Sequence, residues 1–79
     1  SQALLEHEVI VGAHTHISTG TKVNGGVRIG DGVMLGSGSV ILPGLEIADE
    51  VIIGAGSLVT HNITEPGTMW YGSPARRTR

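Results

Sequence analysis

Large aliphatic residues recur at every sixth position over most of this chain. Counting from Leu5 in steps of six, ten successive positions are Leu, Ile or Val, although these types make up only 22 of the 79 residues. The positions are Leu5, Val11, Ile17, Val23, Ile29, Leu35, Ile41, Ile47, Ile53 and Val59. If positions were independent, such a match in any of six registers would have a chance on the order of 10⁻⁵. The spacing therefore predicts a repeating unit of six residues.

The positions around each aliphatic residue keep the same period. Three residues after it, most hexads carry a residue that tolerates a positive φ angle, namely Gly20, Gly26, Gly32, Gly38, Gly44, Gly56 and Asn62. His14 takes this position in an early hexad. Four residues after it stands mostly Val, Thr or Ser, which suits a second and smaller inward position. Each hexad is thus expected to be a short strand followed by a turn.

A six-residue unit is too short for a hairpin and does not fit the 3.6-residue period of an α-helix. Hexads that wind in one direction stack as parallel strands about 4.8 Å apart, which predicts an all-β, single-stranded parallel β-helix. A coil buries its inner face only by stacking on its neighbours. The period leaves open how many hexads complete a coil and which way the coil turns, and general rules for parallel crossovers favour the right hand.

Composition narrows the class of protein. A chain of 79 residues without cysteine forms one small domain with no disulfides, so oligomerisation is the remaining source of extra buried area. The net charge of −2 argues against a nucleic-acid-binding protein. Arg76, Arg77 and Arg79 nevertheless form a basic tail that either meets phosphates or is simply solvated. The sequence contains no apolar run of the roughly 20 residues that span a membrane and no signal peptide, so we expect a cytoplasmic protein.

Of the four histidines, one has a neighbourhood that favours catalysis. His14 and His61 are most simply interpreted as exposed turn residues, and strand alternation points His16 outward, because it directly precedes inward Ile17. His7 is flanked by two glutamates, and a carboxylate beside a histidine fixes its tautomer and raises its basicity. A general base that works near neutral pH needs such a partner.

Six stretches of the chain resemble the hexapeptide-repeat acetyltransferases of bacterial sugar pathways, the NeuD/PglD type. They are residues 6–12, 16–18, 25–30, 42–44, 54–60 and 72–76. The resemblance covers nearly the whole chain, and its most selective parts are the His-Glu pair, the spaced second histidine and the Gly-x-Pro-Ala-Arg tail. It implies a left-handed β-helix with three hexads per coil, about three to four coils in this chain, and a homotrimer.

The resemblance also implies a role for individual residues. His7 matches the base that deprotonates the acceptor, and Glu8 matches the residue that orients this base. Gly25 matches a glycine whose backbone N–H group donates to the acetyl carbonyl oxygen. His16 matches a second histidine near acetyl-CoA. The implied cofactor-binding tail is Gly72, Ser73, Pro74, Ala75 and Arg76, and the chemistry requires no metal. Simpler interpretations remain open: Gly25 as a turn glycine, Pro74 as the end of a strand, and the tail arginines as oligomer contacts.

Geometry then limits how these residues combine. With roughly 18 residues per coil, His7 and His61 share a column but lie three coils apart, about 14 Å. His7 and His16 are half a circuit apart and point away from each other. A site that uses both is therefore expected between subunits.

The resemblance predicts two parts, residues 1–63 as the β-helix and residues 64–79 as a capping and cofactor-contacting tail. The N-terminal nucleotide-sugar-binding domain of the family is absent, and the chain does not begin with methionine, which indicates a piece of a longer protein.

The leading hypothesis for the function is an acetyl-CoA-dependent N-acetyltransferase acting on a nucleotide-linked amino sugar. The alternatives are a sugar O-acetyltransferase acting on a substrate such as sialic acid, a trimerising β-helix without activity, and a zinc hydratase of the γ-carbonic anhydrase type. The last needs three histidine ligands, and His14 and His16 are the only close pair.

Overall fold

The computed structural model describes residues 3–79, which form twelve strands and no helix. Within this range no helix is available that could cross a membrane. The strands are β1 (Leu4–Leu5), β2 (Ile10–Val11), β3 (His16–Ile17), β4 (Lys22–Val23), β5 (Arg28–Ile29), β6 (Met34–Leu35), β7 (Val40–Ile41), β8 (Glu46–Ile47), β9 (Ile52–Ile53), β10 (Leu58–Val59), β11 (Met69–Gly72) and β12 (Ala75–Arg77). The first ten strands coincide with the aliphatic positions of the hexads, so the predicted strand-and-turn unit is confirmed.

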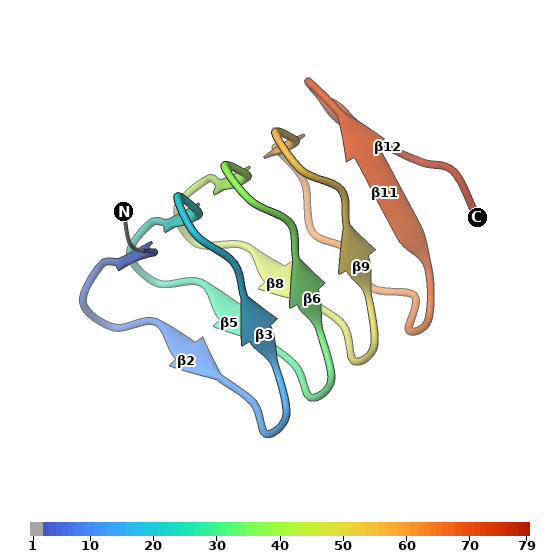
Figure 1. The fold of residues 1–79 in the computed structure, drawn as a ribbon. Helices are drawn as coiled ribbons and strands as arrows, with labels where there is room; N and C mark the ends of the chain where they lie inside the picture. The colour runs from blue at the N-terminus through green and yellow to red at the C-terminus, as the bar shows by residue number, and fades with distance from the viewer. Residues whose placement is uncertain (1–2) are drawn as a thin grey trace.

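The strands wind into a parallel β-helix with three faces (Figure 1). The first face is β1-β4-β7-β10, the second is β2-β5-β8, and the third is β3-β6-β9-β11-β12. Among β1 to β10, paired strands are parallel and 18 residues apart, as Leu4 opposite Lys22 and Ile10 opposite Arg28 show. One coil therefore contains three hexads, and the chain makes about four coils.

The interior is filled by the predicted inward positions. The aliphatic residue of each hexad is at most 3% exposed in the second and later coils: Val23, Ile29, Leu35, Ile41, Ile47, Ile53 and Val59. The smaller inward position is at most 1% exposed at Thr21, Val27, Val33, Ser39, Val51 and Ser57. Leu5 and Val11 are 45% and 39% exposed, because no described strand lies on their outer side.

The fourth coil closes with a different spacing. Ile63 bridges Ile47, and Trp70 pairs with Ile53 of β9. The inward residues Val59, Ile63 and Trp70 are therefore separated by four residues (63 − 59) and seven residues (70 − 63) instead of six. The strand that contains Trp70, β11, forms an antiparallel hairpin with β12 at the end of the third face. The division at residue 63 into a β-helix and a cofactor-contacting tail stays a prediction.

Two glycines of one turn predict different costs of substitution. A Cβ atom on Gly36 would lie 2.5 Å from the Ala55 nitrogen, whereas one on Gly38 would meet nothing within 4 Å. Gly38 instead has a φ of +72°, which is unfavourable for other residues. We expect Gly36→Ala to lower the free energy of unfolding by about 2–3 kcal/mol, because backbone atoms must move. Gly38→Ala should cost only about 1 kcal/mol.

Urea unfolding followed by circular dichroism measures both variants under identical conditions. Equal losses at the two positions would show that neighbouring coils are not in the close contact described at Gly36.

Candidate functional site

His7 and Glu8 lie in the turn between β1 and β2, which we call the first corner because it joins the first and second faces. Both residues are exposed. Glu8 has a φ of +64°, whereas Gly26 and Gly44 take up the equivalent conformation in the next two coils. A residue with a Cβ atom costs about 1 kcal/mol or more there, and such strain often gathers at functional sites. His14 shares the conformation, so strain alone does not single out Glu8.

Gly25 lies directly beneath His7 in the next coil. A Cβ atom on Gly25 would be 3.4 Å from the His7 carbonyl oxygen and 4.0 Å from the Glu6 Cβ atom. Among residues 3–79, no backbone carbonyl accepts a hydrogen bond from the Gly25 N–H group. The structure therefore brings two predicted site residues together at one corner, and it leaves this N–H group without a backbone partner.

His16 lies on the third face, in the first strand of that face. It is exposed, while its neighbour Ile17 packs against the core, so the predicted outward direction is confirmed. The first corner is opposite the third face in a three-sided coil (Figure 1). One chain therefore does not bring His16 to the His7–Gly25 corner.

The predicted cofactor-binding residues form the hairpin at the far end of the third face. Gly72 ends β11 and donates a backbone hydrogen bond to the buried Ser57 hydroxyl oxygen at 3.0 Å. Ser73 and Pro74 make the turn, and Ala75 begins β12. The hairpin follows the first strand of its sheet by three parallel pairings, about 14 Å along the axis. Neither His7 nor His16 is near it.

The tail arginines differ in their surroundings. Arg77 Nη1 donates to Glu65 Oε1 at 2.9 Å, in an ion pair between largely exposed side chains. This is the one salt bridge within residues 3–79, so Arg76 remains exposed and unpaired there. The sequence predicted a single basic tail, and the fold separates its members.

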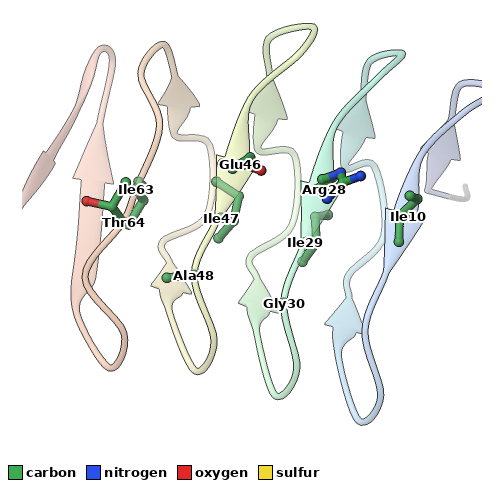
Figure 2. A pocket seen from close by; sticks show the side chains of 9 residues that line it. All are labelled: Ile10, Arg28, Ile29, Gly30, Glu46, Ile47, Ala48, Ile63 and Thr64. Carbon is green, nitrogen blue, oxygen red and sulfur yellow. The ribbon is translucent and has the colours of Figure 1, made fainter.

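A shallow cavity of about 410 Å³ lies on the second face (Figure 2). It is lined by residues from four successive coils, namely Ile10, Arg28, Ile29, Gly30, Glu46, Ile47, Ala48, Ile63 and Thr64. Figure 2 shows Arg28 and Glu46 on neighbouring strands, where they are register partners without an ion pair. None of the predicted site residues lines this cavity. In the sequence this surface corresponds to residues at 18-residue spacing, where two opposite charges, Arg28 and Glu46, follow Ile10.

No group of three or more His, Cys, Asp and Glu side chains suited to a metal ion occurs in the part of the chain that the structure describes. His14 and His16, the pair weighed for zinc, stand in a turn and on a strand and do not gain a third ligand among residues 3–79.

Comparison with known proteins places the chain among acyltransferase folds. A perosamine N-acetyltransferase mutant from Caulobacter crescentus, in complex with CoA and GDP-perosamine, is 28% identical with a TM-score of 0.94, over 98% of this chain and 36% of its own. LpxA from Acinetobacter baumannii is 32% identical with a TM-score of 0.86, and the match covers 98% of this chain and 32% of LpxA. Serine acetyltransferase from Neisseria gonorrhoeae, in complex with serine, is 28% identical with a TM-score of 0.77. This match covers 94% of this chain and 39% of the serine acetyltransferase.

The chain thus spans only about a third of the length of these proteins. The family described as bacterial transferase hexapeptide (six repeats) matches residues 26–61. These likenesses confirm the fold class, a left-handed parallel β-helix, and they overrule the general preference for right-handed crossovers. The chain therefore has the β-helix of the hexapeptide acyltransferases and carries their repeat over its central residues.

Proposed function

We propose that this chain is the catalytic β-helix of an acetyl-CoA-dependent acetyltransferase that acetylates the amino group of a nucleotide-linked sugar. The observation that carries the proposal is the exposed first corner, where His7 stands directly above Gly25. A base and a free backbone N–H donor at one place are the two groups that acyl transfer requires. The perosamine N-acetyltransferase, in complex with CoA and GDP-perosamine, supports the choice of substrates.

In the proposed reaction, the nitrogen of the sugar amine forms a bond to the thioester carbon. His7 takes the proton that this amine loses. Glu8, the next residue in the chain, would orient the imidazole once substrate is bound. The Gly25 N–H group donates a hydrogen bond to the carbonyl oxygen as that atom gains negative charge. The carbon–sulfur bond then breaks, and His7 returns its proton to the leaving thiolate. The products are the acetylated sugar and the free thiol of coenzyme A.

We further propose that the active unit is a homotrimer with its site between subunits. In a single chain the His7 corner is open to water, and His16 lies on the opposite face. The outward side of the third face also exposes Met34 by 50% and Ile52 by 37%. Apolar side chains lined up on a surface favour contact with another protein. A neighbouring subunit would bury these residues and bring its own His16 to the His7 corner.

The tail residues Gly72 to Arg76 would then hold coenzyme A, with its reactive thiol toward His7. Arg76 supports this role, because an unpaired guanidinium group binds phosphate oxygens strongly. We expect the protein in the cytoplasm, in keeping with its lack of cysteine.

The release of free thiol from acetyl-CoA tests the activity. Because the chain contains no cysteine, the protein itself gives no background with a thiol-reactive dye. We expect release with a UDP-linked amino sugar, and none without an acceptor. Release with sialic acid alone would instead indicate the O-acetyltransferase. If calorimetry detects no coenzyme A binding, the proposal is wrong and the non-catalytic β-helix is favoured.

A further inference from the structure

Tyr71 is the most exposed large apolar side chain among residues 3–79, at 61%. Its neighbour Trp70 packs against the core and donates Nε1–H to Thr68 Oγ1 at 2.8 Å. Strand alternation turns the two rings to opposite sides of β11. The fold therefore uses one aromatic ring for packing and leaves the other on the surface.

The Tyr71 ring is held against the backbone of the preceding coil. A Cβ atom on Gly54 would collide with the ring, meeting Cδ1 first, Cε1 at 3.2 Å and Cγ at 3.3 Å. Glycine at position 54 thus leaves the space that the ring occupies. A ring that is supported on one side and exposed on the other loses little conformational entropy when a flat ligand stacks on it.

Arg76 stands beside this ring. In the antiparallel β11–β12 pair, Tyr71 is the register partner of Arg76, and side chains of such partners lie on the same side of the sheet. Arg77 is the partner of Trp70 and is bound to Glu65. The fold therefore places the unpaired Arg76 next to the exposed ring, whereas Arg77 is held in an ion pair with Glu65.

We propose that Tyr71 and Arg76 form a binding platform for a nucleotide, and that this nucleotide is the adenosine phosphate end of the cosubstrate. The ring of Tyr71 stacks on the base, and the Arg76 guanidinium contacts a phosphate group. The inference rests on the proposed function, and it adds Tyr71 to the tail residues already assigned to coenzyme A.

The position of the platform along the β-helix favours the cosubstrate over the acceptor. Tyr71 belongs to the fourth strand of the third face, whereas His16 belongs to the first. Three pairings separate them by about 14 Å. A thioester at the level of the histidines therefore requires an extended molecule to reach the platform. The amino group of the acceptor must lie next to His7, in the first coil. The platform lies at the opposite end of the β-helix.

Calorimetric titration of the full chain with three probes tests the platform. The probes are coenzyme A, dephospho-coenzyme A and 4′-phosphopantetheine, which lacks the nucleoside. We expect Tyr71→Leu to weaken coenzyme A binding about 5- to 100-fold, because it removes base stacking but keeps an apolar contact with Gly54. Tyr71→Phe should stay within about two-fold of the natural chain, and 4′-phosphopantetheine should bind all three proteins equally. Arg76→Gln should weaken binding, and the matched control Arg77→Gln should not.

Several outcomes would overturn the platform. Equal affinity of Tyr71→Leu and the natural chain for coenzyme A shows that the base does not stack there. When the same variants are also titrated with a UDP-linked sugar, a loss confined to that probe assigns the platform to the acceptor. A changed oligomer mass in light scattering assigns Tyr71 to a subunit contact. If the natural chain does not bind coenzyme A, both the platform and the proposed function fail. If it binds and only the Tyr71 effect is missing, the proposed function stands.

Discussion

Replacing His7 by glutamine is expected to lower the rate of acetyl transfer by about 10²- to 10⁴-fold, the range that general base catalysis contributes. Glutamine keeps a polar side chain of similar length but takes no proton from the acceptor amine. His7 is exposed in a turn, so the free energy of unfolding should change by less than about 0.5 kcal/mol. Thiol release from acetyl-CoA measures the rate, and urea unfolding measures the stability.

His14→Gln is the matched control for this variant. His14 is also an exposed turn residue of the first coil, and unlike His7 it has a positive φ. It should keep the activity of the natural chain. Normal turnover by His7→Gln would refute the role of His7 as the base, whereas equal losses in both variants would point to a general effect of altering the first coil.

The repeat could be predicted from the sequence because side-chain direction and backbone period are tied together in a short strand. An aliphatic residue at every sixth position must fall on the same side of every strand, and Val23, Ile41 and Val59 are buried accordingly. The stacking of Gly25 beneath His7 follows from the same register, since the two are 18 residues apart (25 − 7). Handedness could not be predicted in this way, because a hexad pattern is the same in either hand.

The end of the β-helix was less predictable. The hexad pattern stops at Val59, and nothing in it indicates that the next inward residues are Ile63 and Trp70. The different surroundings of Arg76 and Arg77 depend on this closure, because Glu65 lies in the segment that leads into β11. Trp70 and Tyr71 are neighbours in the sequence, which by itself does not separate their roles. Only Trp70 packs against the core, because alternation along β11 turns Tyr71 outward.

Mixing two inactive variants is expected to restore activity if the proposed site is shared between subunits. His7→Ala removes the base, and His16→Ala removes the second histidine that we place near the thioester. After refolding in equal amounts, the two kinds of chain are distributed at random among the trimers. If a site takes His7 from one subunit and His16 from its neighbour, about one quarter of the sites are complete, and the mixture should recover about that fraction of the activity.

The mixing experiment distinguishes a site within one chain from a site shared between two chains. The activity of each variant measured separately does not distinguish them. If His7 and His16 acted within one chain, every site in the mixture would lack one histidine, and the activity would stay at the level of the separate variants. The three-sided coil argues against that arrangement, because the first corner faces away from the third face. Recovery therefore requires both a symmetric oligomer and a site that neither chain completes by itself, which is the arrangement that we propose for the His7 corner.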